Sequence, residues 1–246
     1  MNEGVTNLGD ILELKRGNFI CLSARPGMGK TSFALQIAME YAQNSGNAVY
    51  VLSLDLTAED VYLRMACALG EVDVLSARRG TFTEEEKGRI SQALEALKQM
   101  DIIIDDPRVL TASQVVSRIE ALDHVGLVVI DDGRGLLHMF DPSMPQVFKR
   151  VCQQKNIPLL YAHHLPRKVE RRWNKRPRLK DLKGMPTLVR AADTILFLYR
   201  DSYYHIRGGE EDLCQIHLAK NRYGSTSVVL CAWNRRCMKF GLGSRT

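Results

Sequence analysis

Short apolar runs alternate along this chain with longer segments in which apolar residues recur at helical spacing. The runs cover residues 19–22, 48–54, 102–104, 126–132, 157–162 and 194–199, and each has the length of a buried strand. Two more strand candidates, residues 216–219 and 228–233, follow without a helix between them. This order predicts an α/β fold with a mostly parallel, doubly wound sheet and an antiparallel C-terminal extension.

Capping pairs indicate where three of the helices begin, because a Thr side chain and a residue three positions later can satisfy backbone N–H groups at a helix start. The pairs are Thr57 with Asp60, Thr83 with Glu86, and Thr111 with Gln114. They predict helices that end near residues 69, 100 and 122, and a further helix is expected at residues 146–155. Without a repeat or a low-complexity linker, we expect one domain over residues 1–246, with residues 1–17 as a lead-in segment.

The turn after the first strand carries the strongest chemical signal. Residues 24–31 read Ala-Arg-Pro-Gly-Met-Gly-Lys-Thr and precede a helical pattern. This phosphate loop follows G-x-x-x-x-G-K-[ST] with Ala24 in place of the first Gly. In that pattern backbone N–H groups surround an anion, Lys reaches the β- and γ-phosphates, and the hydroxyl holds Mg²⁺. The alternative is a glycine turn that opens an ordinary helix. The predicted nucleotide-binding residues are Arg25, Pro26, Gly27, Met28, Gly29, Lys30, Thr31 and Ser32.

Polar side chains end three of the other predicted strands. Asp55, Asp131 and His164 each follow or close a different apolar run. An apolar strand that ends in Asp is the Walker B pattern, in which the carboxylate supports Mg²⁺; otherwise Asp131 only caps a loop. Because ligands of doubly wound sheets bind beyond the carboxyl ends of the strands, we expect all three side chains near the phosphates of Lys30.

Charge is concentrated in one part of the chain. The net charge is +6, and residues 167–183, the basic segment, hold nine Lys and Arg beside only Glu170 and Asp181, so the rest of the chain is nearly neutral. This local excess predicts a polyanionic ligand, and the alternative is a solvated run of charge. The candidate binding residues are Arg167, Lys168, Arg171, Arg172, Trp173, Lys175, Arg176, Arg178, Lys180 and Lys183.

Composition also excludes several classes of protein. The six cysteines are scattered without C-x-x-C spacing, which indicates reduced core residues and neither a metal site nor a disulfide frame. No apolar run reaches the ~18 residues of a membrane span, and the start has no signal-peptide pattern. We therefore expect a cytoplasmic protein without a membrane partner.

The motifs together resemble the RecA-type motor domain of the DnaB-family replicative helicases. The resemblance extends from about residue 6 to residue 240. It rests on residues 24–31, 53–55, 129–131, 164–167, 175–177 with 181–182, 192–193, 199–201 and 220–224. It implies a RecA-like fold and ATP bound with Mg²⁺ through Lys30, Thr31 and Asp131.

The resemblance also implies roles for four further residues. Asp55 stands where the family has a Glu that orients the attacking water, and His164 stands at the position of a γ-phosphate sensor. Lys220 and Arg222 match a basic pair that reaches the nucleotide of a neighbouring subunit. The alternative for His164 is a packed strand-end histidine, and for the basic pair a solvated strand terminus. Residues 164–186 match a DNA-contacting loop, for which we expect little base specificity.

Three departures from the family pattern affect the prediction. Asp55 is one methylene shorter than Glu, which moves the carboxylate by about 1.5 Å, and such a misplacement can lower a rate ~100-fold. The region 132–145 is short at the position where the family has a first DNA-binding loop, and Gly184 stands where the family usually has Glu. The sequence begins at the motor domain, so we expect any hexamer to be weak.

The function predicted from the sequence is an ATP-dependent motor that binds single-stranded DNA and hydrolyses ATP in DNA replication. We expect a homo-oligomer, a hexamer if it assembles, with other replication proteins as further candidate partners. One alternative is an ATP-gated DNA-binding or helicase-interacting protein that has lost efficient turnover. A small-molecule kinase is a weaker alternative, because the sequence shows no obvious lid and the basic segment favours a polymer.

Overall fold

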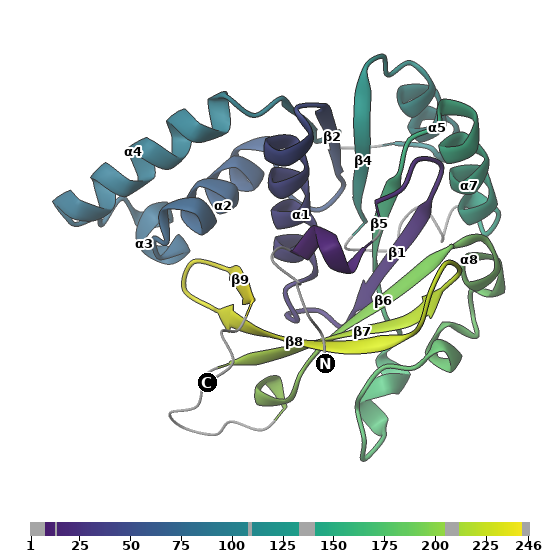
Figure 1. Cartoon of the computed structure of the whole chain (residues 1–246). Helices are drawn as coiled ribbons and strands as arrows, with labels where there is room; N and C mark the ends of the chain where they lie inside the picture. Colours follow the sequence, from purple (N-terminus) through teal and green to yellow (C-terminus); the bar gives the residue numbers. More distant parts are fainter. Residues whose placement is uncertain (1–7, 13, 108–109, 133–140, 205–211, 243–246) are drawn as a thin grey trace.

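A single mixed sheet forms the centre of the molecule (Figure 1). The computed structural model describes residues 8–12, 14–107, 110–132, 141–204 and 212–242. Within them the strand order is β3-β2-β4-β5-β1-β6-β7-β8-β9. The first six strands in the chain are parallel, and the last three run antiparallel. The predicted fold class is therefore confirmed.

The strands agree with the predicted apolar runs. The parallel strands are β1 (Phe19–Ala24), β2 (Ala48–Ser53), β3 (Ile102–Asp105), β4 (Val125–Asp132), β5 (Leu159–His164) and β6 (Thr194–Arg200). The antiparallel strands are β7 (Leu213–Asn221), β8 (Ser227–Asn234) and β9 (Lys239–Leu242). The apolar pattern did not predict β9, a strand of only four residues.

Helices cover both faces of the sheet (Figure 1). The α-helices are α1 (Lys30–Ser45), α2 (Ala58–Gly70), α3 (Val74–Arg79), α4 (Glu84–Lys98), α5 (Ala112–Glu120), α7 (Met144–Lys155) and α8 (Pro186–Ala191). Short 3-10 helices are η1 (Leu8–Ile11), η2 (Arg167–Arg171), η3 (Leu179–Leu182) and η4 (Asp201–Tyr203). Helices α1, α2 and α4 pack on one face, and α5, α7 and α8 on the other.

The predicted helix starts are present. Full capping boxes open α4 at Thr83 and α5 at Thr111, and the Thr57 side chain accepts a hydrogen bond from the N–H of Asp60 at the start of α2. Each such cap stabilises a helix by about 1 kcal/mol. Helix α3 was not predicted, because its six residues are too few to show a helical period. It begins instead at Asp73, whose side chain accepts from the N–H groups of Leu75 and Ser76.

The strands at the centre of the sheet are buried on both faces, as parallel strands covered by helices must be. All six residues of β1 are buried, and alternate ones enter different halves of the core. Phe19 and Cys21 pack under α7, whereas Ile20 and Leu22 pack under α1. All six cysteines are buried and free, and their burial agrees with the prediction of core residues. In the described part of the chain, no helix is long and apolar enough to cross a membrane.

The parallel strands give the sheet two functionally different edges. At the carboxyl edge, Ala24 of β1 pairs with His164 of β5, and Ser53 of β2 pairs with Asp131 of β4. At the amino edge, where these strands begin, β7 ends against the start of β6, because the two are antiparallel.

Candidate nucleotide site and nucleic-acid interface

The phosphate loop leaves β1 at the carboxyl edge and enters α1. Gly27 and Gly29 have φ angles of 80° and 93°, a left-handed conformation that favours glycine. A Cβ at Gly27 would lie 2.7 Å from the ring of Tyr203, and one at Gly29 would lie 2.8 Å from the ring of Phe240. Both glycines are therefore required by conformation and by packing. The C-terminal strands and η4 support the loop, which the sequence analysis did not anticipate.

Lys30, Thr31 and Asp131 meet directly. Lys30 Nζ lies 2.9 Å from Asp131 Oδ1, and the Thr31 hydroxyl donates to Asp131 Oδ2 at 2.7 Å. Lys30 and Asp131 are both buried, with side chains 4% and 2% exposed. A buried pair of this kind costs desolvation energy, so its presence at a loop of this shape indicates function more than stability.

The oxygen atoms of Thr31 and Asp131 fit Mg²⁺. This ion prefers oxygen ligands and is usually held by one or two protein groups, with water and phosphate completing its octahedron. Within the described residues, no group of three or more His, Cys, Asp and Glu could hold a metal by protein ligands alone. The donor set therefore suits an ion that arrives with a nucleotide.

His164 and Asp55 lie within electrostatic range of this cluster. Burial, and next the charge of Lys30, lower the pKa of His164 from 6.5 to about 4, so its imidazole is neutral at pH 7. Asp131 and Asp55 act on it in the opposite direction. Asp55 is exposed just beyond the end of β2. Asp55, Asp131 and His164 therefore gather at one edge around Lys30, as their positions at strand ends predicted.

Arg64 of α2 is a site residue that the sequence analysis missed. It is partly buried, and its Nε has no hydrogen-bond partner among the described residues. Burial and the neighbouring Arg78 lower its pKa, and Asp60, Asp131 and Asp55 oppose this shift. The sequence did contain a signal for Arg64. It lies three residues after Val61 and so falls on the buried face of the helix, where a charged side chain is rare unless it has a partner or a function.

Arg200 holds the phosphate loop from the side of β6. Its Nη2 donates to the carbonyl of Gly27 at 2.5 Å, and its Nη1 donates to Asp212 at 2.7 Å. The guanidinium lies 5.2 Å from the ring centre of Trp233, and burial lowers its pKa. These contacts connect the phosphate loop to the end of β6, which is far from the loop in sequence.

The remaining predicted residues of the loop occupy different environments. Met28 and Ser32 are buried, whereas Pro26 is exposed. Arg25 is buried, and its side chain donates to the carbonyl of Leu165 and to Glu170 of η2. The loop is thus connected to the beginning of the basic segment.

Three cations of the basic segment are held by contacts within the segment or with neighbouring elements. Arg172 donates to both carboxylate oxygens of Asp181, at 2.8 and 2.9 Å, and to the carbonyl of Arg176 at 2.8 Å. Arg176 lies over the ring of Tyr199, and Lys175 lies over the ring of Tyr204. These three side chains are therefore poor candidates for contacting a ligand first.

The other six cations are exposed and have no ion pair with any described residue. They are Arg167, Lys168, Arg171, Arg178, Lys180 and Lys183. Trp173 is fully exposed among them, at 100% of its accessible area. A cationic surface with an exposed indole offers both phosphate attraction and a platform for base stacking.

Lys220 and Arg222 lie at the amino edge. Lys220 Nζ donates to the carbonyls of Val189 and Ala192, and Arg222 Nη1 lies 3.2 Å from Asp193 Oδ1. Burial, and next the charge of Arg222, lower the pKa of Lys220.

Arg222 is separated from the phosphate loop of its own chain by the length of β1. Asp193, which pairs with Arg222, is fully buried and also accepts from Lys149 and from the N–H of Phe19, the first residue of β1. The six residues of β1 span roughly 17 Å. Arg222 therefore cannot reach phosphates at Lys30 of the same chain.

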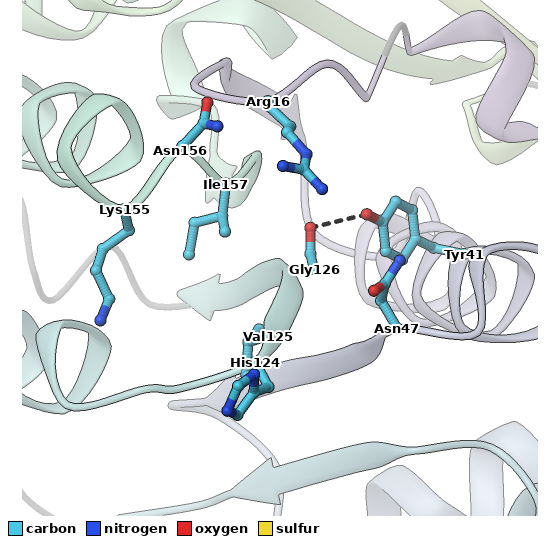
Figure 2. Close-up of a pocket in the computed structure, with 9 residues that line it drawn as sticks. All are labelled: Arg16, Tyr41, Asn47, His124, Val125, Gly126, Lys155, Asn156 and Ile157. Carbon is cyan, nitrogen blue, oxygen red and sulfur yellow. Dashed lines mark hydrogen bonds between the residues drawn. The ribbon is translucent and has the colours of Figure 1, made fainter.

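A pocket of about 260 Å³ also lies at the amino edge (Figure 2). Tyr41 donates to the carbonyl of Gly126 there, at 2.9 Å. Arg16 and Lys155 line it close to the C-terminal ends of α1 and α7, whose negative dipole ends favour cations. This pocket is distant from the phosphate loop, and it is not part of the nucleotide site.

Comparisons with known proteins agree with this geometry. A family model described as the DnaB-like helicase C terminal domain matches residues 1–241. The replicative DNA helicase DnaC of Bacillus subtilis (strain 168) is 31% identical over 240 residues, which are 92% of this chain and 52% of the relative. The replicative DNA helicase DnaB of Geobacillus stearothermophilus is 30% identical over 238 residues, with the same coverage. The chain spans about half the length of the curated relatives it matches.

Two solved structures are similar over most of the chain. A DnaB-like replicative helicase, studied with its interactions with primase, has a TM-score of 0.85 and 27% identity over 93% of this chain and 58% of the other. The second structure is an ATPase domain, with a TM-score of 0.84 and 28% identity over 92% of this chain and 85% of the other.

Proposed function

Since this chain belongs to the family of DnaB-like helicase C-terminal domains, we propose that it is an ATP-dependent motor that binds single-stranded DNA in DNA replication. The observation that carries the proposal is the contact of Lys30 and Thr31 with Asp131 beside a glycine loop shaped for phosphate. The relatives are replicative DNA helicases, which favours a motor over a DNA-binding protein without turnover.

The residues of the carboxyl edge divide the work of phosphoryl transfer. Lys30 would neutralise the β- and γ-phosphates, and Thr31 and Asp131 would hold Mg²⁺, which when bound would supply further positive charge to the transition state. Asp55 orients the attacking water as a general base. We propose that the neutral imidazole of His164 hydrogen-bonds the γ-phosphate and so senses whether this phosphate is present.

A further cation near the transferred phosphate would speed hydrolysis. Arg222 lies a strand length away from its own Lys30, so it can act only on nucleotide bound by another subunit. We propose that Arg222, with Lys220 beside it, is an arginine finger acting between subunits of a homo-oligomer, by family analogy a hexamer. A finger of this kind contributes 10³–10⁵-fold in kcat.

The exposed cations of the basic segment, with Trp173, form the proposed DNA surface. Phosphate contacts of this kind are independent of sequence, and stacking on one indole tolerates every base. Since a DnaB-like relative has been studied with primase, replication proteins are a further class of partner for this chain.

ATP hydrolysis measured with and without single-stranded DNA, across a series of protein concentrations, tests the proposal. We expect turnover to rise with DNA and with protein concentration, because sites complete themselves between subunits. A chain that binds ATP and DNA but shows no hydrolysis under any of these conditions would instead be an ATP-gated binding protein.

Replacing Arg171, Arg178, Lys180 and Lys183 with Ala tests the DNA surface. Each phosphate contact contributes about −0.7 to the log–log salt slope of single-strand binding, so the slope should flatten by up to ~3 units. A matched control replaces four exposed cations of α3 and α4: Arg79, Lys87, Arg89 and Lys98. Equal effects of the two variants would assign the binding to net charge and remove the segment from the site.

A further inference from the structure

Arg25 occupies an unusual position inside the phosphate loop. Its side chain is buried, and both of its hydrogen bonds leave the loop: Nε donates to Glu170 Oε1 at 2.9 Å, and Nη1 donates to the carbonyl of Leu165 at 2.7 Å. The backbone adds a third link, because the N–H of Leu165 donates to the carbonyl of Ala24 at 2.9 Å. The first two residues of the loop are thus fastened to the residue that follows His164.

Glu170 lies at the other end of this connection, in η2 at the start of the basic segment. The segment has only two acidic residues, and they do different things. Asp181 pairs with Arg172 within the segment, whereas Glu170 pairs with a residue of the phosphate loop. Glu170 is therefore a charged residue of the basic segment that contacts the phosphate loop directly.

The same contact extends toward the cations of the segment. Tyr204 is close enough to Glu170 and Arg25 for their charges to act on it, and burial with Glu170 raises its pKa to about 12. Lys175 lies over the Tyr204 ring, at 5.3 Å from the ring centre. A movement of Arg25 would therefore change the electrostatic environment of Tyr204 and of Lys175, which is close in sequence to Trp173.

We propose that Glu170, through its ion pair with Arg25, is the positioning residue that couples nucleotide in the phosphate loop to DNA binding by the basic segment. The inference rests on the proposed function, since it requires both ligands. Phosphates in the loop place negative charge near Arg25 and compete with Glu170 for it, so occupancy of the loop changes how firmly the segment is held. Coupling between two ligands is reciprocal, and factors of 5–150 are typical.

The test compares the parent chain with Glu170→Gln, which keeps the size of the side chain and removes its charge. The affinity for a fluorescent oligo-dT is measured by anisotropy in Mg²⁺, without nucleotide and with a non-hydrolysable ATP analogue. We expect the analogue to change the parent's DNA affinity at least ~5-fold, and to change that of the variant less than 2-fold. Reciprocally, oligo-dT should change the affinity for the analogue in the parent only.

Asp181→Asn is the matched control, because it breaks the other acid–base pair of the same segment without touching the loop. It should weaken DNA binding equally with and without the analogue, and so retain the parent's ratio. Glu170→Asp keeps the charge and should restore part of the coupling. Without DNA, Glu170→Gln should bind the analogue at least as tightly as the parent, because phosphate no longer competes with a carboxylate for Arg25, and such binding shows that its loop is intact.

The outcomes separate the two proposals. A parent that binds no ATP analogue or no oligo-dT overturns the proposed function and this inference with it. A parent that binds both ligands independently overturns the coupling alone. A Glu170→Gln chain that keeps the parent's ratio also overturns the role of Glu170, as does a ratio lost equally in Asp181→Asn.

Discussion

The two edges of the sheet both carry basic side chains, but these side chains have different partners. At the carboxyl edge, Lys30 pairs with Asp131 beside the glycine loop, so the groups for phosphate and metal already converge. At the amino edge, Lys220 is held by backbone carbonyls and Arg222 by Asp193. The carboxyl edge brings together most groups of a nucleotide site, whereas the amino edge holds cations that are far from the phosphate loop of their own chain.

Under the proposed function, this difference makes catalysis by one domain depend on its neighbours. A cation needed only in the transition state need not lie beside the nucleotide of its own chain. If it comes from another subunit, hydrolysis occurs only where two subunits meet.

The largest expected effect is that of Arg222→Ala. Loss of an arginine finger should lower kcat by 10³-fold or more and leave ATP affinity within a few-fold of the parent. Steady-state hydrolysis and equilibrium binding of a fluorescent ATP analogue measure the two quantities. Mixing this variant with Lys30→Ala should restore some activity, because one chain keeps its finger and the other its phosphate loop. Failure of the mixture, with turnover independent of concentration in the parent, would contradict a site shared between subunits.

Lys30→Ala should disrupt the carboxyl edge alone. Removal of the cation at the β- and γ-phosphates should lower ATP affinity or turnover by at least ~10-fold, because the charge of the transition state is stabilised mainly by positioned cations. Lys98→Ala, which removes an exposed lysine of α4, is the control. Unchanged nucleotide binding and turnover in a folded Lys30→Ala chain would place the nucleotide elsewhere.

Changes at Asp55 should have intermediate effects on the carboxyl edge. Asp55→Asn removes the base and should lower kcat, by ~10-fold or more, while Asp55→Glu lengthens the side chain toward the position usual in the family and should raise kcat. Both rates are measured at saturating ATP with single-stranded DNA. Undiminished turnover of Asp55→Asn would show that another group activates the water.

The smallest effect concerns His164 and stability. Its pKa in the folded chain is about 4, below its ordinary value of 6.5, so the unfolded chain binds the proton first as the pH falls. Stability should therefore decrease from about pH 6.5 to pH 4, by on the order of 1–2 kcal/mol after allowance for solvent screening. Urea unfolding of the parent and of His164→Gln across this range measures it. Identical pH dependence in the two chains would contradict a neutral, shielded imidazole.

Much of the carboxyl edge could be predicted from the sequence because its signals are local. A glycine loop between a strand and a helix, and an Asp at the end of an apolar strand, each specify their own geometry. Since parallel strands share one edge, the convergence of Lys30, Asp131 and His164 followed from the fold class. The contacts of Tyr203 and Phe240 with the loop could not be predicted, because they join residues ~170–210 positions apart through tertiary packing.

The roles of individual cations in the basic segment, in contrast, could not be predicted from the sequence. Its composition predicted a polyanion, but composition treats nine cations alike, and the fold does not. Arg172 is held by Asp181 nine residues away, and Arg176 lies over Tyr199 of β6. Such pairings depend on which side chains tertiary structure brings together. Only the fold separates the cations that build the segment from those left for a ligand.

The contrast between the two tryptophans gives the chain an optical reporter of its own. Trp173 is fully exposed at the surface of the basic segment, whereas Trp233 is 7% exposed beneath the phosphate loop. Emission from Trp173 should be red-shifted and readily quenched by iodide, and that of Trp233 should be blue-shifted and protected. A base that stacks on Trp173 quenches the red component alone. Intrinsic fluorescence can thus follow the arrival of a strand in real time, without a label on either molecule.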